Sequence, residues 1–449
     1  MRIFIALMLT LAAFALSPAP AEEPLSAERL RAMANENPER ALSLFREFLA
    51  FPNDAAYPED ILELLAWLEP QFSKRGFDVR RISTEGSPVL FAERKAEGAP
   101  RTALIYLQAD GQPVDPSLWT QPSPWTAVMK KPEGDQWAIA DWPATGATLD
   151  PAIDPDWRVF ARSASDSKGP MTQFLLAIDA IDKAGLATAY NLKVIVDTEE
   201  EKGSPNLADA VAANRDVLAA DFLLIFDGPP HASNRPTIAF GARGVTTITL
   251  TSYGPKTPQH SGHYGNFAPN PAFHLARILA SMKSADGRVR IKGFYDGVKV
   301  PKDVRAALAA VPDDEAAILK GMGLAEADKV APSLQEALQY PALNIRGLDA
   351  AWVGKEARTI IPATAIAEID IRTVKETDPE RLVALVRKHI EKEGYYVIDR
   401  APTAEERAAH PRIVSFVYNV SYAAFRSDFD APPGLLARAG MRRLYGEEP

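Results

Sequence analysis

Short apolar runs alternate with helical spacing in the first half of the chain. The strand-like runs are 102–107, 157–160, 192–196 and 222–226. Between the second and third runs, apolar residues recur every three or four positions over 171–181, as on one face of a helix. This alternation of strand and helix predicts an α/β domain with a largely parallel sheet.

Polar and acidic residues follow the end of each run. Gln108 and Asp110 follow the first run, Asp166 the second, residues 199–201 the third and Asp227 the fourth. In parallel α/β sheets, ligands bind beyond the carboxyl ends of the strands. We therefore expect these side chains to gather at one edge of the sheet.

The N-terminal stretch has the pattern of a secretory signal. Arg2 precedes an apolar run over 3–16, and Ala19-Pro-Ala21 offers a small-residue cleavage pattern. We predict a signal peptide over 1–21 and a periplasmic or secreted protein. The alternative is a membrane anchor, but the run is shorter than the ~20 residues that a spanning helix needs. No membrane span is expected after cleavage.

The helical and strand patterns beyond the signal predict further elements. Amphipathic helices are expected over 26–50 and 61–68. The segment 114–157 is rich in proline and tryptophan and shows little periodicity, which predicts a long ordered loop. Such a loop either wraps the sheet or forms a wall of a substrate site.

The pattern changes near residue 241 and predicts a compact α+β unit. Residues 246–251 and 365–371 alternate like strands, 275–282 carry a helical stripe, and Asp378-Pro379 supplies an N-cap and a first-turn proline. The predicted domains are a signal peptide over 1–21, a catalytic domain over 22–240, an inserted lid and dimerisation domain over 241–398, and the C-terminal part of the catalytic domain over 399–449.

Composition narrows the functional classes. The length of 449 residues favours at least two domains. Fifty Lys and Arg against 59 Asp and Glu give a net charge of -9, which argues against a nucleic-acid partner. With no cysteine, disulfides, thiolate metal sites and a cysteine nucleophile are impossible. Any metal must be held by His, Asp, Glu or amide oxygens.

The acidic run 199–201 has two interpretations. Alone, such a run is typical of a solvated turn. Here it follows a buried type of strand and precedes Lys202-Gly203, so the like charges repel unless a cation neutralises them. A shared carboxylate such as Asp166 can bridge two divalent ions ~3.5 to 4 Å apart.

Several motifs together resemble the zinc-dependent aminoacylase, carnosine dipeptidase and glutamate carboxypeptidase family of metallopeptidases. The matching segments occur in the family's order and cover most of the chain after about residue 40. They are Gln108-Ala-Asp110, 163–170, 199–204, Asp227-Gly228, His260-Ser-Gly262, 344–347, 360–362 and 369–372. The resemblance implies a catalytic α/β domain with a two-metal centre and an inserted α+β lid that mediates a homodimer.

The resemblance also implies roles for individual residues. Asp166 would bridge two divalent metal ions, with zinc expected and manganese or cobalt as alternatives. Asp227 would bind the first ion and Glu201 the second, while Glu200 would be the general base for an attacking water.

Three lid residues carry implied roles as well. His260 would reach the partner subunit's active site and stabilise the oxyanion. Asn344 and Arg372 would hold the carboxylate end of a small peptide or N-acyl amino acid, a task that suits a bidentate arginine. For two of them a plainer interpretation stays open: a turn-capping role for His260, and pairing with Glu368 and Asp370 on its own strand for Arg372.

Two departures from the family weaken its metal centre. Gln108 stands where the family has a histidine ligand, and its amide oxygen is a weaker zinc ligand than imidazole. We hypothesise that Asp110 accepts a hydrogen bond from the Gln108 amide group, which turns the amide oxygen to the metal. The family's last histidine ligand has no counterpart before Pro449, which predicts either a truncated sequence or an incomplete second site.

These observations leave two functional hypotheses. The first is a secreted metallohydrolase that cleaves an amide bond of a small peptide or N-acyl amino acid. The second is a catalytically silent relative that binds peptides or serves as a dimeric scaffold, which Gln108 and the missing histidine favour. A serine hydrolase is disfavoured, because Ser163, Ser165 and Ser167 lack the glycines of a nucleophile elbow.

Overall fold

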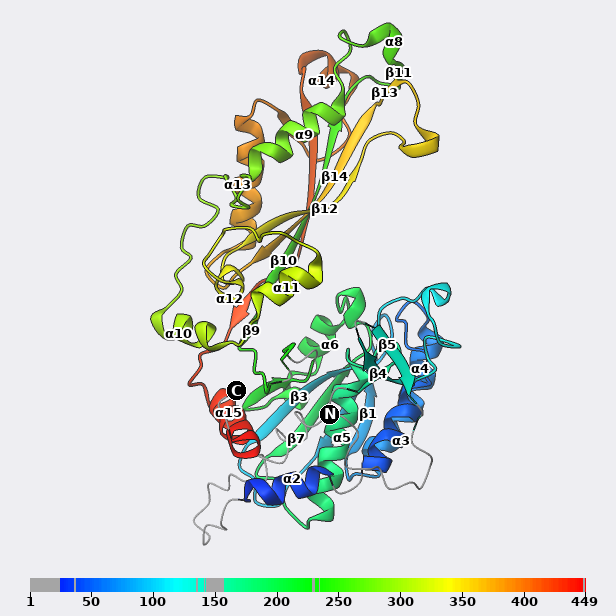
Figure 1. The fold of residues 1–449 in the computed structure, drawn as a ribbon, viewed down its shortest axis with the longest axis vertical. Helices are drawn as coiled ribbons and strands as arrows, with labels where there is room; N and C mark the ends of the chain where they lie inside the picture. The colour runs from blue at the N-terminus through cyan, green and yellow to red at the C-terminus, as the bar shows by residue number, and fades with distance from the viewer. Residues whose placement is uncertain are drawn as a thin grey trace. The chain divides into compact units, whose positions relative to one another are not determined.

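The computed structural model divides the chain into two compact units. It describes residues 25–35, 38–134, 136–140, 142, 157–227, 231–233, 235–446 and 449. The first unit comprises Met1–Ile238 and Phe429–Pro449, and the second comprises Ala239–Asp428 (Figure 1). The predicted signal peptide over 1–21 lies outside the described residues. No helix among the described residues combines the length and hydrophobicity needed to cross a bilayer.

The first unit is built on a five-stranded sheet of order β1-β2-β7-β3-β8. Its strands are β1 (Asp78–Ile82), β2 (Val89–Arg94), β3 (Thr102–Gln108), β7 (Asn191–Asp197) and β8 (Phe222–Ile225). β3 pairs in parallel with β7 and β8, whereas β2 is antiparallel to both β1 and β7. The α/β prediction is confirmed, with a mixed sheet whose parallel part carries the predicted acids.

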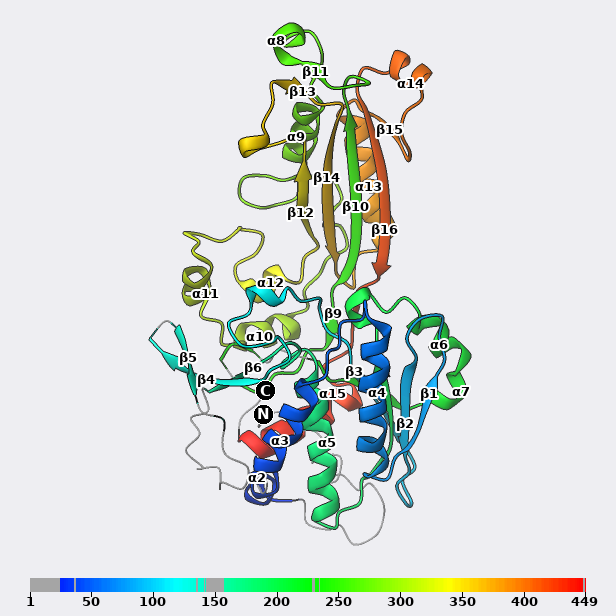
Figure 2. The same ribbon diagram turned by 90° about the vertical axis from the view of Figure 1, so that its right-hand side faces the viewer.

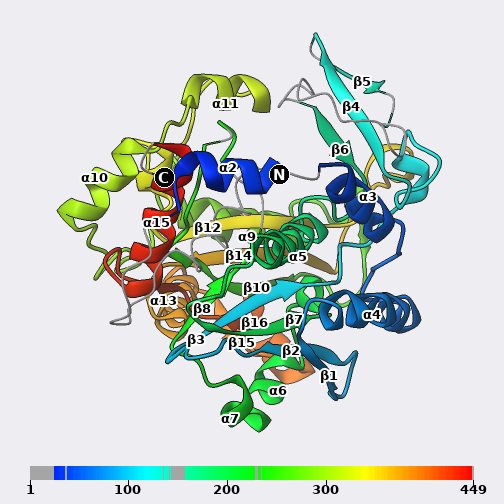
Figure 3. The ribbon, with the colours of Figure 1, turned by 90° about the horizontal axis from the view of Figure 1, so that it is seen from below.

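Helices cover both faces of this sheet (Figure 3). α4 (Pro58–Ser73) and α5 (Lys168–Lys183) pack on one face in a core that includes Phe72, Phe174 and Ile178. α6 (Leu207–Ala213) and α7 (Arg215–Leu218) pack on the other face. The remaining helices of the unit are α2 (Ala27–Asn35), α3 (Pro38–Leu49) and α15 (Pro432–Tyr445). The predicted helical stretch 26–50 is thus two helices, the second beginning at a proline.

The Trp- and Pro-rich segment, predicted as a long loop, contains strands between residues 128 and 140 that its sequence did not predict. β4 (Val128–Glu133), β5 (Gln136–Ala140) and β6 (Arg158–Phe160) form a separate three-stranded sheet, while Pro116–Leu118 form a short 3-10 helix. The run 157–160 was predicted as a strand of the central sheet, and the structure corrects this, because β6 pairs with β4 in the separate sheet. Its residues are half-buried, unlike those of a central parallel strand.

The second unit contains a five-stranded sheet of order β12-β14-β10-β16-β15 (Figure 2). Its strands are β10 (Gly244–Tyr253), β12 (Ala342–Asp349), β14 (Thr364–Thr373), β15 (Tyr396–Ile398) and β16 (Ile413–Tyr422). The longest helices, α9 (Pro271–Met282) and α13 (Pro379–Lys392), share a core with the inward-facing residues of the sheet. Asp378 caps α13 by accepting from the backbone N–H of Arg381 at 2.7 Å, as the Asp-Pro pair predicts.

Smaller elements complete the second unit. The short pairs are β9 (Gly241–Ala242) with β17 (Phe425–Arg426), and β11 (Gln259–His260) with β13 (Ile360–Ile361). The short helices are α8 (Ser261–Tyr264), α10 (Lys302–Ala310), α11 (Glu315–Met322), α12 (Leu334–Ala337), the 3-10 turn Gly354–Glu356 and α14 (Ala404–Ala409).

The C-terminal boundary of the second unit differs from the predicted one. The sequence assigned 399–449 to the catalytic domain, but β16 pairs with β10 over eight registered positions from Val245 to Ser252. β16 therefore belongs to the second unit, which continues to Asp428. Only the segment that holds α15 returns to the first unit.

The alternating burial along β14 predicts that shortening a side chain costs more stability on one face of the strand than on the other. Ile369 is fully buried, and Ile366 lies half-buried on the opposite face of the same strand. We expect Ile369→Ala to lower the free energy of unfolding by about 2–5 kcal/mol, and Ile366→Ala to lower it by clearly less. Urea denaturation followed by circular dichroism checks this, and equal losses would contradict the assigned core face.

Candidate active site and metal centre

The ends of the parallel strands place the predicted acids side by side. Gln108 and Asp197, the last residues of β3 and β7, are direct partners in the parallel register. The backbone N–H of Ala109 donates to the carbonyl of Asp197 at 2.8 Å, and that of Phe226 donates to the carbonyl of Tyr106 at 3.0 Å. The segments that follow β3, β7 and β8 therefore leave the sheet at one edge, as the sequence predicted.

The Ser167 hydroxyl marks the point where three of these segments meet. Its Oγ lies 2.8 Å from Gln108 Oε1, 2.7 Å from Asp166 Oδ1 and 3.1 Å from Asp227 Oδ1. Ser167 and Gln108 are buried, whereas Asp166 and Asp227 are exposed to solvent. Three residues predicted as metal ligands thus surround one hydroxyl group.

Asp110 has a different partner from the one predicted. Its Oδ2 accepts from the backbone N–H of Glu201 at 2.9 Å, and its buried Oδ1 has no hydrogen-bond partner among the described residues. The hypothesis that Asp110 orients Gln108 by accepting from its amide group is therefore wrong for this structure. Asp110 instead fastens the acidic turn to the end of β3.

The acidic turn is a short 3-10 helix over Glu200–Lys202, held by buried carboxylates. Asp197, 2% exposed, accepts from the backbone N–H groups of Thr198 at 2.7 Å and Glu199 at 3.1 Å through Oδ1. Its Oδ2 accepts from the hydroxyls of Tyr106 at 2.9 Å and Ser204 at 2.5 Å. This fourfold acceptor fixes the turn to β7.

Glu199 differs from the two acids that follow it. It is 5% exposed and accepts from Lys202 Nζ at 2.9 Å and from Asn206 Nδ2 at 2.6 Å. These partners, the Lys202 hydrogen bond foremost, hold the pKa of Glu199 below its usual value despite burial. Glu199 is therefore a structural anion, and Glu200 and Glu201 are the acids that remain for chemistry.

Burial and neighbouring negative charges raise the pKa values of Glu200, Glu201 and Asp110. Burial, followed by the negative charges of Glu201 and Asp110 and then of Asp227 and Asp166, raises the pKa of Glu200 to about 7. Burial raises the pKa of Asp110 to about 7 as well. For Glu201 the pKa is also raised, first by burial and then by the charge of Asp166. The site concentrates negative charge.

The oxygen donors at this edge suit a divalent cation. They do not form a typical set of zinc ligands, which would include histidine. Within the described part of the chain, no group of three or more His, Cys, Asp or Glu side chains is arranged to hold a metal ion. The oxygens of Gln108, Asp166 and Asp227 do converge, and the third member of the set is an amide rather than a histidine. Burial and then the negative charge of Asp166 raise the pKa of Glu201, whose Oε2 accepts from Gln112 Nε2.

The structure also identifies framework residues that sequence reasoning missed. Asn53, fully buried, donates to the carbonyl of Ala109 at 2.8 Å and to Ser163 Oγ at 3.1 Å, while its own carbonyl accepts from the N–H of Gly111. A Cβ at Gly111 would lie 2.1 Å from Ser163 Oγ, so this crossing requires glycine. Asn53 carries no chemical signature in the sequence, because its role depends on contacts between distant segments.

Lys168 anchors the other side of the Asp166 loop. It is fully buried, and its Nζ donates to the carbonyls of Phe48 at 3.1 Å and Phe51 at 2.5 Å. Its Nζ also lies 5.4 Å from the centre of the Trp125 ring. Burial lowers the pKa of Lys168 to about 7. The Ser-Lys-Gly sequence thus fixes the start of α5 directly after Asp166.

The predicted lid residues lie in the second unit, with local partners. His260 Nδ1 accepts from the backbone N–H of Gly262 at 3.0 Å and caps α8, and its ring lies 4.7 Å from that of His263. Arg372 Nε donates to Asp370 Oδ2 at 3.0 Å, and Asn344 pairs in register with Asp370. Asn344 and Arg372 thus lie on neighbouring strands, and His260 lies at the separate β11–α8 turn.

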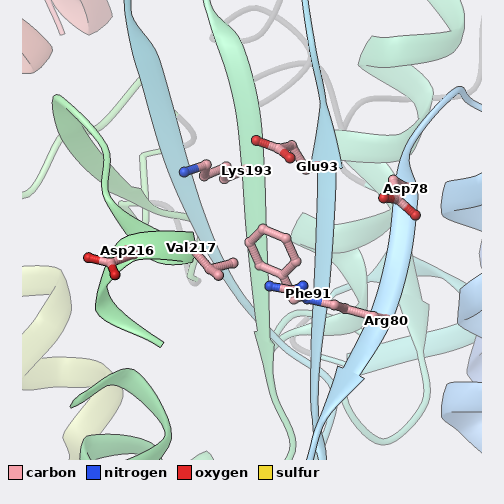
Figure 4. A pocket seen from close by; sticks show the side chains of 7 residues that line it. All are labelled: Asp78, Arg80, Phe91, Glu93, Lys193, Asp216 and Val217. Carbon is pink, nitrogen blue, oxygen red and sulfur yellow. The ribbon is translucent and has the colours of Figure 1, made fainter. Parts of the chain in front are cut away.

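A surface pocket lies elsewhere in the first unit (Figure 4). It measures about 260 Å³ and is lined by residues of β1, β2, β7 and α7: Asp78, Arg80, Phe91, Glu93, Lys193, Asp216 and Val217. The Arg80 guanidinium lies 5.0 Å from the centre of the Phe91 ring, and Lys193 Nζ donates to the carbonyl of Ala219. The cations of this pocket therefore have partners, and none of the predicted catalytic residues lines it.

Comparisons with known proteins agree with the fold and the motifs. Residues 240–397 match the peptidase dimerisation domain. The chain is 26% identical to the Cys-Gly metallodipeptidase dug1 of Schizosaccharomyces pombe over 76% of this chain and 69% of that protein. It is 22% identical to the human Beta-Ala-His dipeptidase over 99% of this chain and 85% of that protein.

Solved structures give the same picture. The M20 family metallo-carboxypeptidase Sso-CP2 from Sulfolobus solfataricus superposes with a TM-score of 0.72 at 28% identity, covering 91% of this chain and 84% of that one. Human carnosine dipeptidase 1 shares the fold with a TM-score of 0.72 at 20% identity, covering 95% and 86%. Fold and relatives define a hydrolase of the peptidase class. These similarities confirm the resemblance to the metallopeptidase family that the motifs of the chain carry, with the match to the peptidase dimerisation domain confined to residues 240–397.

The raised pKa of Glu200 predicts how pH changes the stability of the metal-free protein. The pKa is about 7 in the folded state against an ordinary 4.5, so between these values the folded protein holds a proton that the unfolded chain releases. Stability therefore falls as pH rises through this window. We expect Glu200→Gln to remove part of that fall, a gain of roughly 1 kcal/mol near about pH 8 after solvent screening, and little gain near about pH 5.

Urea denaturation in the presence of a chelator at both pH values measures this difference. Glu97→Gln, at an exposed glutamate outside the site, is the matched control and should leave the pH dependence unchanged. A gain from Glu200→Gln that is the same at both pH values would show that proton binding at Glu200 is not its cause.

Proposed function

We propose that this protein is a metal-dependent hydrolase that cleaves the amide bond of a small peptide, with a dipeptide as the first substrate to test. The convergence of Gln108, Asp166 and Asp227 on the Ser167 hydroxyl, beside the Glu200–Glu201 turn, carries this proposal. The names of two relatives described above support the substrate class, since both are dipeptidases. An N-acyl amino acid presents the same kind of bond and is the alternative substrate.

Gln108, Asp166 and Asp227 would hold the first cation, and Asp166 and Glu201 would contribute to a second. Bound divalent cations supply Lewis-acid polarisation of a carbonyl oxygen and make water a stronger acid. Zinc is the cation expected from the family resemblance, with manganese or cobalt as alternatives. Asp166 and Asp227 are exposed residues, so a cation and a substrate can approach them from solvent.

Glu200 would transfer the proton in this reaction. A general base works best when its pKa lies near the working pH, and burial with neighbouring acids brings that of Glu200 to about 7 in the absence of cations. Its carboxylate would take a proton from the attacking water and later deliver that proton to the leaving amine. Asp197 and Asp110 keep the backbone of the turn in place during both transfers.

Arg372 and Asn344 would bind the carboxylate end of the substrate. Arg372 is exposed on β14 and donates to Asp370 through Nε, so its terminal guanidinium nitrogens can make a bidentate contact with a carboxylate. His260 would stabilise the oxyanion in the active site of a partner subunit. This role rests on the match to a dimerisation domain, from which we also propose a homodimer.

Export to the periplasm or the extracellular space is part of the proposal. It is supported by the charged, apolar and small-residue order of residues 1–21.

Glu200→Gln tests the catalytic assignment. Gln keeps the size of the side chain and cannot accept the proton, so kcat for dipeptide hydrolysis should fall by about 10²–10⁴-fold with KM changed far less. Steady-state kinetics with added divalent cation measures both constants, and Glu97→Gln should retain wild-type rates. Wild-type protein that binds no cation and hydrolyses no dipeptide would instead indicate the silent scaffold.

Arg372→Met tests carboxylate recognition. The loss of a charge-assisted pair should raise KM for a free dipeptide by about tenfold or more, at about 1.5–3 kcal/mol per such hydrogen bond. The KM for the matching dipeptide amide, which lacks the carboxylate, should change little. Equal effects on both substrates would contradict the role of Arg372. Lys375→Met, a cation on the chain just beyond β14, is the control for general charge.

A further inference from the structure

We propose that the position formed by Gln108, Asp166 and Asp227 is an all-oxygen cation site, suited to Mn²⁺ or Mg²⁺ rather than Zn²⁺, and that Gln108 sets this preference. The inference rests on the proposed metal dependence and departs from the zinc expected by resemblance. Its basis is the geometry of these three side chains and of the hydroxyl between them.

The three oxygens come from separate segments yet surround one atom. Gln108 ends β3, Asp166 precedes α5, and Asp227 follows β8. Their oxygens lie 2.8, 2.7 and 3.1 Å from Ser167 Oγ. Because each segment is fixed by the backbone bonds of the sheet or by the start of α5, this convergence is a property of the fold.

The number of acceptors around Ser167 exceeds the number of protons it can offer. A serine hydroxyl has one hydrogen, so it can donate to one of the three oxygens at a time. The other two oxygens then face the hydroxyl oxygen at hydrogen-bond distance without a hydrogen between them. A cation beside the group removes this mismatch, because carboxylate, amide and hydroxyl oxygens are all cation ligands.

Gln108 cannot leave this position for solvent. It is 3% exposed, and Ser167 beside it is 1% exposed. A buried amide oxygen needs a partner, and the shared hydroxyl satisfies it only part of the time. By contrast, the exposed Asp166 and Asp227 provide an entry path for an ion and places for its remaining water ligands.

The donor set decides the class of ion. Carboxylate, carbonyl and water oxygens suit Mg²⁺, Ca²⁺ and Mn²⁺, whereas imidazole suits Zn²⁺. A given site still binds Zn²⁺ more tightly than Mn²⁺. The quantity that Gln108 controls is therefore the ratio of the Zn²⁺ affinity to the Mn²⁺ affinity. A small ratio lets the more abundant hard cation occupy the site.

The test measures cation binding directly, without hydrolysis. Dissociation constants for Mn²⁺ and Zn²⁺ are obtained by competition with a chelating dye, and bound Mn²⁺ is counted by electron paramagnetic resonance. Gln108→His should raise the Zn²⁺ affinity about 10–100-fold and the Mn²⁺ affinity much less, which widens the ratio. Gln108→Glu, which keeps an oxygen donor, should leave the ratio close to that of the wild type.

Asp227→Asn locates the site, because it should weaken binding of both ions while the ratio stays small. Circular dichroism melting of each variant shows whether it is folded. The proposal is overturned if the wild type has the wide ratio of Gln108→His, or if the folded wild type binds neither ion. The proposed function and this inference can fail independently. If the wild type binds both ions with a small ratio of Zn²⁺ to Mn²⁺ affinity but cleaves no dipeptide, the proposed function is wrong and this inference still holds.

Discussion

Repulsion among carboxylates at one edge of a sheet is the constraint on which the site depends. Parallel pairing of β3 with β7 and β8 brings the following segments together, whatever charges they carry. The protein meets this repulsion in two ways. The framework acids Asp197 and Glu199 are buried and supplied with donors, while Glu200, Asp166 and Asp227 stay near solvent with surplus negative charge. This surplus negative charge can bind a cation and can hold a proton.

The sequence predicted the elements well because their periodicity reports burial. The strands 102–107 and 192–196, the stripe 275–282 and the alternation of 365–371 all appear where the pattern placed them. At 157–160 the pattern predicted a strand but assigned it to the wrong sheet. After 398 it did not predict β16, and the segment was assigned to the wrong domain. Periodicity shows which face of a strand is buried, and it does not show which strand lies beside it.

The site was predicted as a set of residues but not as a set of contacts. Local spacing and resemblance named Gln108, Asp166 and Asp227, which the fold brings together. They did not reveal that Ser167 lies among them or that Asp110 holds the Glu201 backbone. Such contacts join segments far apart in the chain, and a polar residue such as Asn53 or Ser167 gives no local signal of them.

The anchoring of the acidic turn has a consequence for how this architecture diverges. Asp197 fastens the turn through backbone amides and two neighbouring hydroxyls, none of which belongs to the side chains at 200 and 201. Those two positions can therefore change identity while the loop that presents them keeps its shape. The residues that hold the turn are thus different from the residues that carry its reactive groups. New reactivity, or the loss of reactivity, can therefore arise by exchanging single side chains.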